Sequence, residues 1–199
     1  MAFSLLILNF AIVNKMKMRS CFIILLLSLA FSTACSSDYL RIRKELTKFE
    51  NNEIILPQDM ILIVGDRVEP YQGSLSSAKT FFIYYPSVDC SDCLASKLAS
   101  LVPLRSLAAE KGFEVKCVIS PVEGVRSELI NKLSGINLPD SLFIDQSDSF
   151  LTLNQDMPLD PRFHIFSTDS SGKLFFVGNP CSDVRLFKLF IKTLKHKLL

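Results

Sequence analysis

One short segment in the middle of the chain constrains its fold more than any other. Residues 80–85 (TFFIYY) form an aromatic and β-branched run that is typical of a buried strand. After a short loop come Cys90 and Cys93, a C-x-x-C pair, and then leucines at helical spacing up to Gly112. The segment therefore predicts a strand, a loop and a helix whose first turn carries both cysteines.

The rest of the chain alternates short apolar runs with helical patterns, which predicts an α/β fold. Further strands are expected at residues 54–56, 60–64, 113–120, 142–145, 162–166 and 173–177, and helices at 91–111, 122–133, 150–153 and from 182 onwards. Pro103 is expected to kink the first of these helices, and residues 69–77 read as a loop. The last helix is amphipathic and lysine-rich, a pattern that favours docking on a sheet over lying on an anionic membrane.

The N-terminus has the organisation of a secretory leader. A basic stretch, residues 15–19, precedes an apolar stretch, residues 21–31, which is shorter than the roughly 20 residues that a membrane-spanning helix needs. Small residues then lead to Cys35, an ending that resembles a lipobox with Ser32 in place of the usual leucine. We expect residues 1–35 to be a leader and Cys35 to carry the lipid; an uncleaved membrane anchor is the alternative.

This leader sets the domain organisation and the location of the protein. Residues 1–15 precede the basic stretch and read as a misassigned start, with translation beginning at Met16 or Met18. Residues 36–52 are expected to be a tether or an N-terminal helix, and residues 53–199 a single domain. The expected location is the cell envelope, on the inner or outer membrane and facing the periplasm.

Charge argues against a nucleic-acid partner. The leader holds three of the 22 basic residues and no acidic residue, so the remainder has 19 basic and 20 acidic residues. The net charge of the mature chain is therefore about −1, and no basic stripe with interleaved aromatic residues appears. The sequence also lacks a phosphate-binding loop and a hydrolase nucleophile motif.

Four cysteines remain beyond the leader, in a compartment where disulfides persist. Cys90, Cys93, Cys117 and Cys181 permit three full pairings, and the sequence does not choose among them. The start of a helix stabilises a thiolate, and the second sulfur lies one turn later, close enough to attack a mixed disulfide. A redox pair is favoured over a structural disulfide and over a zinc site completed by His164 or Cys181. Cys117 is expected to be a buried small hydrophobe, and His164 an ordinary strand residue.

The order of these segments resembles that of a known family. The stretch FFIYYPSVDCSDC, the later strand SLFID and the hairpin PRFHIFSTDSSGKLFFVG resemble the thioredoxin superfamily, and more closely the TlpA-like exported thiol–disulfide oxidoreductases. The leader is similar to that of the Bacteroides-type lipoproteins of this kind. The resemblance covers about residues 55–199, and it implies a thioredoxin-like fold, a central mixed β-sheet flanked by helices, with no cofactor.

The resemblance also implies roles for particular residues. Cys90 would be the exposed nucleophile and Cys93 the resolving thiol. Pro161 falls where the family has its cis-proline and would face the cysteines, and the Asp160 backbone would pair with an extended substrate peptide. The implied partners are a protein thiol or disulfide substrate and an electron donor in the membrane or periplasm.

The surroundings of the cysteines depart from the family pattern. Asp89 replaces an aromatic residue, Ser91 and Asp92 replace a proline-containing pair, and no acidic residue follows in the helix's first turn. If Asp89, Asp92 and Asp160 surround Cys90, their charges raise its pKa and disfavour its thiolate. A couple without thiolate stabilisation is more reducing, so we expect a reductase of protein disulfides. The alternative is a non-catalytic thioredoxin-like lipoprotein that acts as a binding module.

Overall fold

The computed structural model describes residues 38–50, 52–73, 78–136 and 140–197. The expected leader and Cys35 lie outside the described residues. The chain divides into two units, residues 1–44 and 45–199, and the second, described here by itself, holds the whole sheet. No helix within the described ranges combines the length and the apolarity that crossing a membrane requires.

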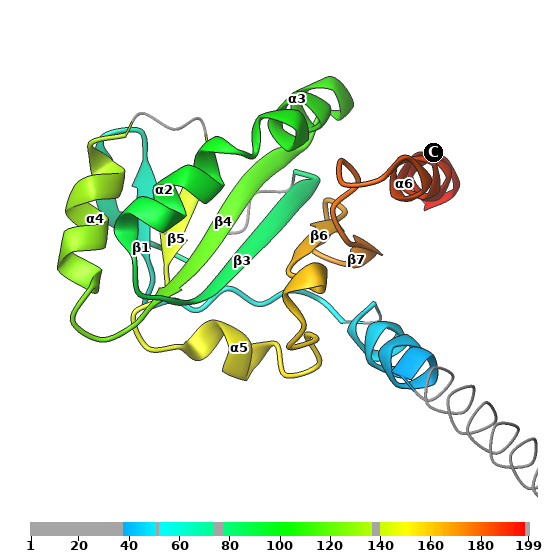
Figure 1. The fold of residues 1–199 in the computed structure, drawn as a ribbon, viewed down its shortest axis with the longest axis horizontal. Coiled ribbons are helices and arrows are strands. Elements are labelled where there is room, and N and C mark those ends of the chain that lie inside the picture. The colour runs from blue at the N-terminus through cyan, green and yellow to red at the C-terminus, as the bar shows by residue number, and fades with distance from the viewer. Residues whose placement is uncertain (1–37, 51, 74–77, 137–139, 198–199) are drawn as a thin grey trace, which may run out of the picture. The chain divides into compact units, whose positions relative to one another are not determined.

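A mixed sheet forms the centre of residues 45–199 (Figure 1). Within the described residues it has seven strands in the order β2-β1-β5-β4-β3-β6-β7. Strands β3, β4 and β5 are parallel to one another, whereas β1, β2, β6 and β7 pair antiparallel with their neighbours. The strands are β1 (Ile61–Val64), β2 (Arg67–Pro70), β3 (Thr80–Val88), β4 (Glu114–Pro121), β5 (Ser141–Ile144), β6 (Ile165–Thr168) and β7 (Leu174–Val177).

Helices flank this sheet. They are α2 (Ser91–Ala99), α3 (Val102–Lys111), α4 (Arg126–Ser134), α5 (Ser149–Leu153), the short 3₁₀ helix η1 (Pro161–Phe163) and α6 (Val184–Lys197). A further helix, over residues 38–49, precedes them in the chain. The expected fold class, an α/β fold with a central mixed sheet flanked by helices, is confirmed. The order of elements after the C-x-x-C pair is the one that the resemblance implies.

The central strand β3 divides its side chains between two hydrophobic cores. Phe81 and Ile83 belong to the core that includes residues of α2, α3, α4 and α6. Phe82 and Tyr84 belong to the opposite core, which Phe49 and Phe150 also join. A strand that is covered on both faces is apolar at every position, which explains the unbroken apolar run that marks β3 in the sequence.

Three sequence-based boundaries are wrong for local reasons. Residues 54–56 are not a strand: Glu53 makes one isolated bridge to Lys173, and the chain then passes into the second core. The expected loop at 69–77 overlaps the end of β2, which forms a hairpin with β1. The helix expected from residue 122 begins only at Arg126, because Gly124 has a φ of +93°, which is not helical.

The single kinked helix expected over residues 91–111 is two helices, α2 and α3. The break falls at Ser100 and Leu101, and Pro103 occupies the first turn of α3. A proline there loses no hydrogen bond, because the first N–H groups of a helix have no partner within it. The expected docking of the last helix is confirmed: Phe190 of α6 is fully buried in the first core.

Candidate active site

The chain leads from the end of β3 to the two cysteines. The pairing of β3 with β4 shifts register between Tyr85 and Val88, which is a β-bulge. Ser87 within this bulge has a φ of 50°, in the left-handed region that non-glycine residues seldom adopt. Bulges bend a strand and re-aim the residues that follow, and they are common beside active sites. Here the bulge leads directly into α2.

Cys90 and Cys93 form a disulfide across the first turn of α2, with their Cα atoms 5.3 Å apart. Cys90 is the N-cap of the helix, and its Sγ accepts a hydrogen bond of 3.2 Å from the backbone N–H of Cys93. A sulfur in this position lies at the positive end of the helix dipole, beside N–H groups that the helix leaves unpaired. The arrangement stabilises a thiolate on Cys90 when the disulfide is open.

The two cysteines differ in exposure, but in the opposite sense from the expectation. Cys90 is half-buried and Cys93 is exposed, so the prediction of an exposed Cys90 is wrong. Cys90 is the N-cap, with extended backbone, and it lines the pocket between α2 and the end of β3. The thiolate-stabilising position, rather than exposure, distinguishes Cys90 from Cys93.

A pocket of about 350 Å³ opens beside the disulfide. Its wall is built from the end of β3, one side of α2 and the segment that precedes β6. Both cysteines line it together with Lys97, Pro161 and His164. The fold therefore brings Pro161 to the pocket of the cysteines, as the resemblance implies.

The peptide bond of Pro161 differs from the implied one. None of the described residues follows a cis peptide bond, so Pro161 does not have the expected cis form. Instead it is the first residue of η1, a position that suits its fixed φ. The Asp160 side chain caps this turn by accepting a hydrogen bond of 3.0 Å from the backbone N–H of Arg162. The local cap thus gives the segment a 3₁₀ turn where the sequence predicted the start of a strand.

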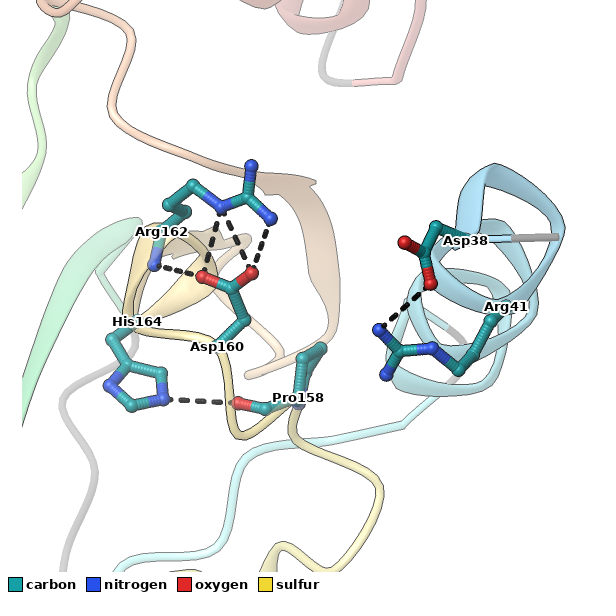
Figure 2. A network of polar contacts seen from close by, with 6 residues as sticks. All are labelled: Asp38, Arg41, Pro158, Asp160, Arg162 and His164. Atoms are coloured by element: carbon teal, nitrogen blue, oxygen red, sulfur yellow. Dashed lines mark hydrogen bonds and ion pairs between the residues drawn. The ribbon is translucent and has the colours of Figure 1, made fainter. Parts of the chain in front are cut away.

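Asp160 is engaged within its own turn (Figure 2). Its carbonyl accepts a hydrogen bond of 3.0 Å from the N–H of Phe163. Its carboxylate binds the Arg162 guanidinium at 2.9 and 3.0 Å, and these hydrogen bonds lower the pKa of Asp160 to about 2. The predicted backbone pairing of Asp160 with a substrate peptide stays a prediction, and its carbonyl already has a partner in η1.

The negative charges expected around Cys90 are largely paired. Asp92 forms an ion pair with Lys132 of α4, and Asp160 forms one with Arg162. Of the three carboxylates, Asp89 alone lines the disulfide pocket, where the cationic Lys97 is also present. Two of the three carboxylates that were expected to raise the Cys90 pKa are therefore paired with a cation. Sequence reasoning missed Lys132 because it comes from another helix, whereas Arg162 is only two residues from Asp160.

Helix α4 contacts Ser91 and Asp92, the two residues between the cysteines. The Ser91 side chain is buried and donates a hydrogen bond of 2.6 Å to Glu128. One turn later on the same helix, Lys132 pairs with Asp92. The first turn of α2, and with it the spacing of the two sulfurs, is therefore fixed by contacts with a second helix.

His164 is a pocket residue that sequence reasoning dismissed. It is buried directly before β6, and its Nε2 lies 3.0 Å from the Pro158 carbonyl oxygen (Figure 2). Burial lowers its pKa, while the bond to Pro158 and the charge of Asp160 act in the opposite direction. Nothing in the sequence marks it beyond its place three residues after Pro161.

The other two cysteines of the domain stay apart from the pair. Cys117 is fully buried in β4, as expected, and burial raises its thiol pKa well above the ordinary value. Cys181 is exposed, and both are free thiols. Among the described residues, no cluster of three or more histidine, cysteine or acidic side chains is arranged to hold a metal ion.

Comparison with known proteins gave likeness in fold only. No protein-family model matches the chain, and no curated protein matches it. The solved structures that resemble it include an uncharacterised thioredoxin-like protein from Porphyromonas gingivalis, a candidate thiol:disulfide interchange protein DsbE from Chlorobium tepidum, and a conserved protein of unknown function from Bacteroides fragilis.

The likeness is distant in each case. The identities are 15%, 15% and 17%, with TM-scores of 0.44, 0.41 and 0.41. The matches cover 72%, 72% and 70% of this chain, and 93%, 99% and 99% of the other chains.

Proposed function

We propose that this chain, whose fold is thioredoxin-like, is a thiol–disulfide oxidoreductase that reduces disulfides in other proteins. The observation that carries the proposal is the Cys90–Cys93 disulfide at the start of α2, with Cys90 as N-cap and both sulfurs beside a pocket. A thiolate at a helix N-terminus is the nucleophile of thiol–disulfide exchange. The pocket gives a substrate sulfur room to approach.

The reaction follows from this geometry. The Cys90 thiolate attacks one sulfur of a substrate disulfide, the substrate S–S bond breaks, and the first substrate thiolate leaves and takes up a proton. The Cys93 thiolate then attacks the Cys90 sulfur, the mixed disulfide breaks, and the second substrate thiolate leaves. The substrate gains two electrons and the pair becomes a disulfide again. A dithiol donor of the membrane or periplasm then restores the reduced pair.

The direction of the reaction is supported by Asp89. It directly precedes Cys90 and lines the same pocket, so its carboxylate opposes the helix dipole at the position of the thiolate. Weaker thiolate stabilisation makes the disulfide the favoured state and the couple a better electron donor. The cation of Lys97, in the same pocket, acts against this effect, and the redox potential of the pair measures the balance.

Reduction of insulin tests the proposed function. We expect the wild-type protein to reduce insulin disulfides with dithiothreitol as donor, and Cys90→Ser to lose this activity. Cys93→Ser is expected to accumulate a mixed disulfide at Cys90, because the resolving thiol is gone. Cys181→Ser is the matched control, since Cys181 is an exposed free thiol away from the pair. Absence of activity in the wild type with every donor would instead favour a binding module.

The proposed location rests on the leader. We propose that residues 1–35 direct export and that Cys35 carries a lipid, so that the domain faces the periplasm from the inner or outer membrane. Mass spectrometry of the mature protein is expected to find Cys35 as the first residue with the mass of a lipid modification. Cys35→Ser should release the protein from the membrane fraction. A mature N-terminus elsewhere, without lipid, would refute this anchoring.

A further inference from the structure

Helix α6 turns one face to the domain and the other to solvent. Phe190 is fully buried in the first core, and Leu186 and Leu194, one turn before and after it, pack against the same core. Figure 1 shows α6 beside β7, the edge strand of the sheet. This docking accounts for the buried stripe of α6, but not for the residues on its opposite face.

The opposite face of α6 is made of cations. Because an α-helix has about 3.6 residues per turn, four basic residues fall within an arc of about 80° centred opposite Phe190. These four residues, which are called the basic face of α6 from here on, are Arg185, Lys188, Lys192 and Lys195. All four side chains are exposed, so the face is open to a partner.

Contacts within the fold do not neutralise most of the basic face. Arg185 pairs with Asp183 at 3.3 Å, but the three lysines form no ion pair with any residue that the structure describes. Like charges three and four residues apart repel one another along a helix. The helix dipole favours Lys195, which lies in the last turn, but Lys188 and Lys192 precede that turn. The stability of α6 alone therefore does not explain this row of cations.

The charges of the mature chain are segregated between α6 and the remainder. Helix α6 contains five basic residues and no acidic one. The other residues beyond the leader contain 14 basic and 20 acidic residues, so their net charge is about −6. An anionic surface attracts α6 and repels the remainder, and such a charge distribution orients a protein as it approaches the surface.

We propose that the basic face of α6 is a docking surface for an anionic lipid bilayer. Val184 and Leu189 flank the face, one on each side, and they are 69% and 52% exposed. Helices that lie on membranes combine cations, which bind anionic headgroups, with apolar side chains that enter the boundary of the acyl chains. A nucleic acid would neutralise the cations but would offer no apolar phase to the two flanking side chains.

The choice of a bilayer as the partner rests on the proposed export and anchoring. An anchor near the N-terminus keeps the domain within reach of lipid but leaves its orientation free. Docking through α6 would give the anchored domain one defined orientation, with the acidic remainder directed away from the lipid. The docking is separate from the exchange reaction at Cys90 and Cys93.

The test reads the contact of α6 with lipid by fluorescence. The chain contains no tryptophan, so Leu189→Trp places a single reporter beside the basic face. The full-length protein is reconstituted in vesicles of brominated phosphatidylcholine, either alone or mixed in equal parts with phosphatidylglycerol. We expect a blue shift and quenching by bromine in the anionic vesicles only. Both should vanish in 1 M salt, where charges are screened beyond about 3 Å.

Charge variants locate the contact. Replacement of the three lysines of the basic face by glutamine should lower the ratio of docked to undocked domain about 100-fold, because each cation near an anionic surface contributes about a factor of five. The matched control replaces Lys48, Arg67 and Lys173 by glutamine, which removes the same charge from exposed positions outside α6, and it should change the ratio little. Equal losses in the two triple variants would show an effect of net charge alone and overturn the proposal.

The remaining outcomes separate this proposal from the others. Equal quenching on both kinds of vesicle, or quenching that persists in 1 M salt, would show an apolar contact and overturn it. A tryptophan that responds to poly-glutamate or DNA in solution, but to neither kind of vesicle, would also overturn it. A protein that does not sediment with phosphatidylcholine vesicles lacks the proposed anchor. Sedimentation with the anionic vesicles alone would then still support docking through α6.

Discussion

At the residue scale, buried charged and polar groups tie neighbouring elements together. Asp140, 3% exposed, accepts hydrogen bonds of 2.8 and 2.9 Å from the Arg105 Nε and so joins α3 to the start of β5. Asp145 is buried as well and accepts 2.8 Å from the N–H of Phe150, at the start of α5. Because a buried carboxylate without a partner is strongly unfavourable, substitution of one partner has a large effect.

Arg105→Ala is expected to lower the free energy of unfolding by about 3–5 kcal/mol, because it leaves the Asp140 carboxylate buried without its cation. Arg185→Ala is the matched control: the Arg185 side chain is 92% exposed in its pair with Asp183, so its loss should have little effect on stability. Urea denaturation at pH 7 measures both. Similar losses for the two variants would mean that burial of the pair does not matter.

The free energy of unfolding depends on pH through His164. Burial lowers its pKa in the folded protein, whereas in the unfolded chain it titrates near its ordinary value of about 6.5. Below that pH the unfolded state binds more protons, so the free energy of unfolding falls as the pH falls. We expect His164→Gln to lose less stability than the wild type between pH 7.5 and 5.5 in urea denaturation of the oxidised protein. Parallel losses in the two proteins would contradict this.

At the element scale, α6 packs on the first core through Phe190, with the partly buried Leu186, Ile191 and Leu194 beside it. Phe190 is fully buried, with its ring centroid 5.4 Å from that of Phe81 and 5.3 Å from that of Phe176. Phe187, three residues earlier on the same helix, is 41% exposed. The apolar pattern of the sequence places both on the docking face, but the structure buries only Phe190 fully.

Phe190→Ala is expected to cost about 3–5 kcal/mol of unfolding free energy, the usual range for a buried phenylalanine. Phe187→Ala removes the same atoms from a partly exposed site and should cost less than about 1.5 kcal/mol. Chemical denaturation of both variants gives the comparison. If Phe187→Ala were the more damaging change, the attachment of α6 described here would be wrong.

The elements that the sequence predicted well are those with a strong local pattern. The β3 run, the helix after Cys90 and the hairpin between β6 and β7 are all found near their expected positions. The prediction failed at residues 54–56, where apolar residues fill the second core without joining the sheet. It failed again at Pro161, where the Asp160 cap turns the chain. In both places a tertiary or capping contact decides a conformation that the apolar pattern leaves open.

At the scale of the whole molecule, the site exists only because the sheet brings distant segments together. Strand β3 lies between β4 and β6, so the segment before β6 reaches the pocket of the disulfide although about 70 residues separate it from Cys93. The sequence located the cysteines, because their motif is local. It did not locate His164 as a pocket residue, or Lys132 as the partner of Asp92, because these depend on the folded arrangement.

The central claim is that Cys90 and Cys93 are a reversible redox pair on a stable fold. Equilibration of the protein in dithiothreitol and glutathione buffers of defined potential, followed by alkylation and mass spectrometry, tests it most directly. We expect one two-electron transition of this pair above about −300 mV, with the fold retained and the buried Cys117 unmodified. Reduction only well below that potential, accompanied by unfolding, would identify a structural disulfide and contradict the account.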